Sequence, residues 1–248
     1  MSRIVLTAAS RVGCVRSNNE DMVLAYDKFV RSEAYYTEFM TENVDRFVIA
    51  LADGMGGYNA GEVASADVLA NLQFFLNDLP KGLSISEFNE MMVVWLDSVN
   101  KMINSKGHVD PTLSEMGTTL VGVLFYGGRY YWINCGDSRL YRFRDGKLSQ
   151  LSTDHSLNTL RGEKRHSNVI TNCIGAGCKN SYIDMYEFTD DFLQGDTYML
   201  CSDGLSDMVH DADIESLMGE AASANRLCEA AIEAGGYDNV STCVFSVM

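Results

Sequence analysis

The stretch from Phe47 to Gly57, FVIALADGMGG, limits the possible folds of this chain more than any other. An uninterrupted apolar run from Phe47 to Ala52 leads into Asp53 and a glycine-rich turn. A continuous apolar run that ends at glycine is typical of a strand buried on both faces. Such a strand would deliver the Asp53 carboxylate to the rim of the core, where a lone negative charge is costly unless a proton, a cation or several donors compensate it.

The same pattern, an apolar strand that ends at an acid beside glycine or asparagine, recurs along the chain. RYYWINC leads to Gly136-Asp137, TYMLC leads to Asp203, and Asp238 stands just before the last expected strand, 241–247. Taken singly, each acid is compatible with an ordinary turn. Acids gathered at strand ends would repel one another unless cations lay between them, so the recurrence favours a carboxylate cluster that binds metal.

The segment Arg16-Ser-Asn-Asn-Glu20-Asp21 places an arginine four residues before paired acids, where an apolar pattern ends. One interpretation is a solvated loop with a capping acid. The functional interpretation is that Arg16 offers a planar fork to an oxyanion, while Glu20 and Asp21 hold a cation or its waters.

Charge and composition narrow the possible partners. The net charge is −15, from 34 acidic against 19 basic residues, without a basic cluster, so nucleic acid and anionic membranes are poor partners. Only four histidines are available, and a metal site built from oxygen ligands favours Mg²⁺ or Mn²⁺ over Zn²⁺.

Cysteine usage and the apolar runs indicate a cytoplasmic protein. The seven cysteines are scattered without a CxxC pair, which predicts that they are reduced and mostly buried. The first residues lack the apolar core of a signal peptide, and no apolar run approaches the length of a membrane span.

The order of elements is readable from the hydrophobic patterns. Strands are expected at 3–15 and 197–201, and hairpins turn at 126–128 and 145–146. Helical spacing predicts a helix over 61–77 and a second over 84–105, the second opened by a capping box of Ser84 and Glu87. Two short helices are expected before the last strand. Without a repeat or a linker, residues 1–248 are interpreted as one domain.

Seven motifs in order, RSNNED, LADGMGG, GTT, NCGDSR, TDHS, CSDGL and YDN, resemble the metal-dependent protein phosphatase family, the protein phosphatase 2C type, in its bacterial form. They extend from about Gly13 to Val247, nearly the whole chain. The resemblance implies an α+β fold, a four-layer α-β-β-α sandwich of two packed antiparallel β-sheets flanked by helix pairs. It also implies that residues 1–248 are a single protein phosphatase 2C-like catalytic domain.

The resemblance further implies a binuclear Mn²⁺ or Mg²⁺ centre. Asp53 would bridge the two ions, and the Gly54 carbonyl would bind the first of them. Asp203 and Asp238 would hold the second ion.

The other motif residues would act around these ions. Glu20 and Asp21 would act through metal-bound waters, and Asp137 with Asp203 would hold a third, weaker metal. Arg16 would clamp the phosphate. Some motif residues are interpreted instead as structural or supporting groups: Thr118, Thr119, His155 and Asn239.

The implied activity is metal-dependent hydrolysis of phosphoserine and phosphothreonine in proteins by a metal-activated water, with Asp53 and Arg16 as the catalytic residues. The substrates would be proteins phosphorylated by a serine/threonine kinase, and the oligomeric state is left open. Two alternatives stand beside this one: a binding module that keeps the fold without the activity, and a phosphatase of small phosphorylated metabolites.

The sequence departs from the family pattern in two places. Met55 and Tyr58 stand where relatives carry a histidine proposed to protonate the leaving alkoxide, so the general acid is unassigned. The segment 156–170 is shorter than the flap of bacterial members, and Asn172 stands where an arginine is usual.

Overall fold

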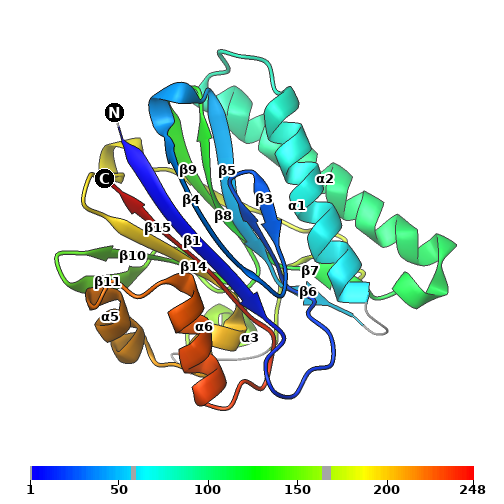
Figure 1. The fold of residues 1–248 in the computed structure, drawn as a ribbon. Coiled ribbons are helices and arrows are strands. Elements are labelled where there is room, and N and C mark those ends of the chain that lie inside the picture. The colour runs from blue at the N-terminus through cyan, green and yellow to red at the C-terminus, as the bar shows by residue number, and fades with distance from the viewer. Residues whose placement is uncertain (1, 57–59, 164–168) are drawn as a thin grey trace.

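The computed structural model of the chain describes residues 2–56, 60–163 and 169–248. Two six-stranded antiparallel sheets face each other, and helices cover their outer faces (Figure 1). This is the expected four-layer α-β-β-α arrangement.

The strands form two large sheets and a small one. From edge to edge, the first large sheet is β11 (Lys147–Gln150), β10 (Arg139–Arg144), β14 (Thr197–Cys201), β15 (Val240–Val247), β1 (Arg3–Arg11) and β4 (Ala34–Met40). The second is β13 (Asp184–Glu187), β9 (Arg129–Cys135), β8 (Leu120–Tyr126), β5 (Arg46–Ala52), β2 (Met22–Ala25) and β3 (Lys28–Val30). The small third sheet joins β12 (Ile174–Gly175), β7 (Gly117–Thr118) and β6 (Gly54–Met55).

The α-helices are α1 (Ala60–Asp78), α2 (Ile85–Val109), α3 (Leu157–Leu160), α4 (Asp203–Ser206), α5 (Asp211–Gly219) and α6 (Ala224–Glu233). Short 3₁₀ helices cover Thr41–Asn43, Pro111–Leu113 and Thr189–Asp191. The Ser84–Glu87 capping box forms as predicted. The sequence pattern missed α4, a single turn that begins at Asp203 itself.

Strand β5 is buried on both faces, as its apolar run predicts. Val48 and Ala50 pack toward α1 and α2, whereas Phe47 and Ile49 belong to the core between the two sheets. The larger of these side chains, Phe47, Val48 and Ile49, each contribute roughly 1.5–3 kcal/mol when fully buried. The strand is therefore a rigid base for the residue that follows it, Asp53.

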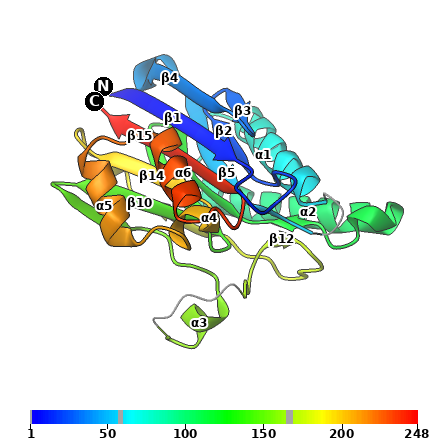
Figure 2. The same cartoon turned by 60° about the horizontal axis from the view of Figure 1, so that its bottom comes forward.

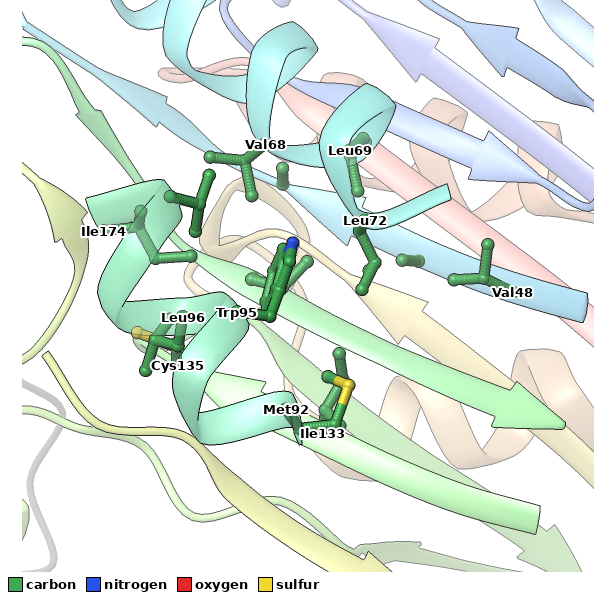
Figure 3. Packing of buried hydrophobic residues seen from close by; sticks show 14 of the residues in the cluster. Val48, Val68, Leu69, Leu72, Met92, Trp95, Leu96, Ile133, Cys135 and Ile174 are labelled. Atoms are coloured by element: carbon green, nitrogen blue, oxygen red, sulfur yellow. The ribbon is translucent and has the colours of Figure 1, made fainter. Parts of the chain in front are cut away.

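The two helix pairs cover opposite outer faces. Helix α2 places Met92, Trp95 and Leu96 against α1 and the sheet below (Figure 3). On the other side, α5 and α6 pack on the first sheet with a third core cluster. Among the described residues, no helix is long and apolar enough to cross a membrane. The seven cysteines are free, and most are buried, as predicted.

Candidate active site

The strand topology brings the acidic turns to one end of the sandwich. Cys201 pairs with Thr242 in the antiparallel β14–β15 ladder, so Asp203 and Asp238 lie at the same end of the first sheet. Arg11 pairs with Val240, which brings the loop after β1 to that end as well.

The second sheet delivers its acids to the same end. Met22 pairs with Ala52, so Asp21 and Asp53 are neighbours across the β2–β5 ladder. Strand β8 is antiparallel to both β5 and β9, and it pairs Leu51 with Val121 and Leu120 with Cys135. The chain therefore leaves β9 toward Asp137 on the side where β5 ends. The acids that the sequence analysis singled out are thus gathered by the fold.

The backbone of Asp53 is held by the two threonines of the GTT motif. Its N–H donates to Thr119 Oγ1 at 3.0 Å, and its carbonyl accepts from Thr118 Oγ1 at 2.8 Å and from the Thr119 N–H at 2.9 Å. Thr119 Oγ1 also lies 2.7 Å from Ser138 Oγ. These hydrogen bonds join the turn after β5 to the turn after β9. They use only the backbone of Asp53, so the Asp53 carboxylate is not needed to hold the two turns together.

Gly54 allows a close approach that any side chain would block. A Cβ at this position would lie 2.2 Å from the Gly61 carbonyl oxygen and 2.5 Å from the Glu20 carbonyl oxygen. Glycine is therefore required for β6 to pass between the start of α1 and the N-terminal loop. The contact brings Glu20 beside the Asp53-Gly54 turn.

Asp21 is fully enclosed and only half satisfied. Its Oδ2 accepts a hydrogen bond from Ser202 Oγ at 2.9 Å, while Oδ1 has no partner among the described residues. Burial, and then the charges of Asp203 and Asp238, raise the pKa of Asp21 to about 7. Ser202, which the sequence analysis did not single out, is thus the hydrogen-bond partner of a predicted site residue.

Asp137 is the most isolated of the buried carboxylates. It is 2 % exposed, and neither of its oxygens has a hydrogen-bond partner in the parts of the chain that the structure describes. Burial and the charge of Asp203 raise its pKa to about 7. A buried carboxylate without donors is costly, which makes Asp137 a candidate ligand for a cation.

Asp53 lies at the electrostatic centre of the cluster. Burial raises its pKa well above the ordinary value, and the negative charges of four neighbours raise it further: Asp21, Asp203, Asp137 and Asp238. Burial also raises the pKa of Glu20. Each of these carboxylates becomes easier to ionise when positive charge enters the cluster, as oxygen-ligand sites for Mg²⁺ or Mn²⁺ require.

Arg16 lies at the rim and is paired with one of the acids. Its Nη2 is 2.6 Å from Asp238 Oδ2, and the side chains are 55 % and 39 % exposed. Asn239 fixes the loop that carries Arg16, because its amide donates to the Val12 and Asn18 carbonyls and its oxygen accepts from the Glu20 N–H.

As the side chains stand, no three His, Cys, Asp or Glu residues within 2–56, 60–163 and 169–248 are close enough together to hold one ion. The donor chemistry nevertheless fits a divalent cation. The unpartnered oxygens of Asp21 and Asp137 are hard, anionic and buried. The ligand assignments remain a prediction.

The residues that concern the unassigned general acid lie as follows. Met55 is half-buried on β6, whereas Tyr58 lies outside the described residues, as does Gly57. His155 is buried outside the carboxylate cluster, with Nε2 3.0 Å from Asp184 Oδ2. No short motif in the sequence indicates the pairing of His155 with Asp184.

A comparison with protein families matches residues 35–233 to the model described as protein phosphatase 2C. The serine/threonine protein phosphatase PstP of Mycobacterium tuberculosis is 36 % identical over 262 residues, which cover all of this chain and 46 % of PstP. The present chain thus spans about half the length of that relative. The serine/threonine phosphatase stp of Listeria innocua is 31 % identical, over 81 % of this chain and 84 % of the relative.

Solved structures agree with these sequence matches. The catalytic domain of PstP in complex with two manganese ions superposes with a TM-score of 0.75 at 36 % identity, over 99 % of both chains. The serine/threonine phosphatase of S. agalactiae superposes with a TM-score of 0.81 at 26 % identity, over 99 % of this chain and all of the other.

Proposed function

The chain belongs to the protein phosphatase 2C family, and from this membership we propose that it is a metal-dependent serine/threonine protein phosphatase. The observation that carries the proposal is the cluster of buried and half-buried carboxylates around Asp53, with unpartnered oxygens on Asp21 and Asp137 and an arginine at its rim. We also propose that residues 1–248 are one catalytic domain. A cytoplasmic location stays a prediction from the sequence.

The proposed cofactor is a pair of Mn²⁺ or Mg²⁺ ions, with a weaker third. Asp53 would bridge the pair with the Gly54 carbonyl beside it, and Asp203 and Asp238 would complete the set. Acids farther from the pair would act through waters or hold the third ion: Glu20, Asp21 and Asp137. When bound, such ions lower the pKa of a shared water, so that a nucleophile for phosphorus exists near neutral pH.

The role of Arg16 is to bind the phosphate oxygens. A guanidinium offers paired N–H donors that match two oxygens of a phosphate ester and offset the charge that develops on them. Arg16 must leave Asp238 to do so. Because both side chains are exposed, breaking this ion pair costs only about 0.2–1 kcal/mol of free energy.

The proposed substrates are proteins that carry phosphoserine or phosphothreonine, placed there by a serine/threonine kinase. The test must distinguish this function from two alternatives: a binding module without activity, and a phosphatase of small metabolites. The intact acids Asp53, Asp203 and Asp238 weigh against the binding module, since a domain that only binds gains nothing from a costly acidic cluster.

Hydrolysis of p-nitrophenyl phosphate with and without Mn²⁺ tests the proposal. We expect turnover that depends on Mn²⁺ and is abolished by EDTA. The same enzyme should then prefer phosphoserine and phosphothreonine peptides over sugar phosphates and nucleotides. Absence of Mn²⁺-dependent turnover would favour the binding module, and a preference for sugar phosphates or nucleotides would favour the metabolite phosphatase.

A further inference from the structure

His155 lies at the base of a chain excursion, between Ser156 and Ile170, that projects from the two packed sheets. After β11 the chain forms α3 away from the two large sheets, and residues 169–173 lead into β12 (Figure 2). Ser156 pairs with Ile170, and the Thr171 N–H donates to the His155 carbonyl at 2.8 Å, so the two ends of the excursion meet at this residue.

His155 makes hydrogen bonds to both backbone polar groups of Gly136, the N–H and the carbonyl. The Gly136 N–H donates to His155 Nδ1 at 3.1 Å, and the Gly136 carbonyl accepts from the His155 N–H at 2.9 Å. Gly136 has a φ of +123°, and a Cβ there would lie 2.6 Å from Thr119 Cβ. The Gly136 carbonyl also accepts from Asn134 Nδ2 at 3.2 Å, so the peptide that precedes Asp137 depends for its conformation on glycine, on His155 and on Asn134.

The hydrogen-bond partners of the imidazole fix its tautomer. A backbone N–H can only donate, so Nδ1 is the unprotonated nitrogen; the Asn172 Nδ2 group donates to the same atom at 2.8 Å. The ring hydrogen is therefore on Nε2, which donates to Asp184 Oδ2 at 3.0 Å. Neither nitrogen remains to give a proton to a substrate.

Asn172 is itself held in one orientation. Its Nδ2 also donates to the Tyr182 carbonyl at 2.8 Å, and its Oδ1 accepts from the Tyr182 N–H at 3.1 Å. The Tyr182 ring packs on the imidazole, with centroids 4.6 Å apart. Asn172 thus supplies a neutral donor that fits an unprotonated Nδ1.

We propose that His155 is a positioning residue: oriented by Asp184 and Asn172, it holds the Gly136 peptide so that the Asp137 carboxylate stays within the acid cluster. The inference rests on the proposed function, because it assigns Asp137 to a cation. Residues that orient metal ligands from behind typically change metal affinity or activity by about 10–100-fold when they are removed.

The test is a calorimetric titration of the metal-stripped protein with Mn²⁺, which needs no turnover. His155→Ala should weaken binding at the Asp137-dependent site about tenfold. His155→Asn should stay within about threefold of wild type, because its Oδ1 can accept the Gly136 N–H. Equal affinities for wild type and His155→Ala would overturn the inference.

The Asp137→Asn background separates positioning from a general loss of structure. If His155 acts through Asp137, His155→Ala should cause no further loss of Mn²⁺ affinity in that background. An equal loss in both backgrounds would contradict the proposal. Asp184→Ala, which removes only the Nε2 partner, is the milder variant should His155→Ala fail to fold, and about a threefold loss is expected. Wild-type affinity in Asp184→Ala would count against the inference.

Aryl phosphates of graded leaving-group pKa give an independent readout. With both ring nitrogens engaged, the dependence of rate on leaving-group pKa should be the same in wild type and His155→Ala. A steeper dependence in the variant would identify His155 as a general acid instead. A wild-type protein that bound no Mn²⁺ would reject the proposed function itself, a result distinct from either outcome for His155.

Discussion

Asp137 and Asp196 are equally buried, each 2 % exposed, yet their protonation behaviour is opposite. Asp196 accepts hydrogen bonds from Arg144 Nε and Nη2, both at 2.6 Å, and from the Tyr198 hydroxyl at 2.9 Å. Burial acts to raise the pKa of Asp196, but these donors and the Leu193 N–H bring it below its ordinary value. Neither carboxylate oxygen of Asp137 has a hydrogen-bond partner on another described residue, and burial, followed by the charge of Asp203, raises its pKa to about 7.

The difference separates a structural carboxylate from a candidate ligand. Burial alone does not distinguish them; the presence of partners does. Asp196 precedes β14, at the opposite end of that strand from Asp203, and Arg144 and Tyr198 satisfy it there. Asp137 and Asp21 are left with unpartnered oxygens at the end where Asp53 and Asp203 also lie.

Activity should separate the two kinds of carboxylate most strongly. Asp53→Asn and Asp203→Asn should each lower Mn²⁺-dependent turnover by more than about 100-fold, because each would remove a proposed charged ligand of the ions that position the nucleophile. Asp196→Asn, assayed per folded molecule, should stay within a few-fold of wild type. Near wild-type turnover of Asp53→Asn or Asp203→Asn at saturating Mn²⁺ would show that these acids are turn residues.

Mn²⁺ should stabilise the protein through the unsatisfied acids. A cation that binds only the folded cluster adds RT ln(1 + [L]/Kd), roughly 2.7 kcal/mol at a hundred times Kd. We expect EDTA to lower the melting temperature and Mn²⁺ to restore it in a concentration-dependent way. Asp196→Asn should gain the same increment from Mn²⁺, and a melting curve insensitive to Mn²⁺ would count against the cation site.

Substitution of the two aspartates should change metal-free stability in opposite directions. Asp196→Asn weakens charge-assisted hydrogen bonds, with an expected cost of about 1.5–3 kcal/mol. Asp137→Asn removes a buried negative charge without donors and should raise the free energy of unfolding by about 1 kcal/mol. Urea unfolding in EDTA at pH 8 measures both. A destabilised Asp137→Asn would indicate a structural partner for this carboxylate.

The pH dependence of the unfolding free energy of the metal-free protein should also distinguish the carboxylates with a raised pKa, Asp21 and Asp137, from Asp196, whose pKa is lowered. The folded-state pKa of Asp21 and of Asp137, about 7, lies above the ordinary 3.8, so the folded protein binds more protons than the unfolded chain between these values. Unfolding free energy should therefore fall as pH rises from about 4 to 7, by up to about 1.4 kcal/mol per pH unit per group, and then level off. The lowered pKa of Asp196 makes the unfolding free energy depend on pH only below pH 3.8.

Unfolding in EDTA at pH 5.5 and pH 8 measures this slope, which Asp137→Asn should reduce and the exposed control Asp190→Asn should not. A wild-type stability that rises over the same interval would contradict the raised pKa values.

The sequence predicted what depends on local pattern and on strand ends. The apolar run before Asp53, the capping box at Ser84 and the acids that follow β9 and β14 are all properties of adjacent residues. Because alternating strands of an antiparallel sheet end on the same side, such acids can be expected to meet once the fold class is known.

Contacts between distant residues were not predictable in the same way. Ser202 donates to Asp21 across 181 positions, and Arg16 pairs with Asp238 across 222. His155 meets Asn172 where Ser156 pairs with Ile170, and it meets Asp184 because β13 pairs with β9. These partners decide which acids are satisfied, and they depend on register and loop closure, which a single sequence does not encode in any short motif.

Anomalous diffraction at the manganese edge, from crystals grown with Mn²⁺, would locate the ions themselves. We expect two strong peaks between Asp53, Asp203 and Asp238, a weaker one at Asp137, and Arg16 released from Asp238. No peak within the cluster at saturating Mn²⁺, with Arg16 still bound to Asp238, would contradict the proposed metal centre.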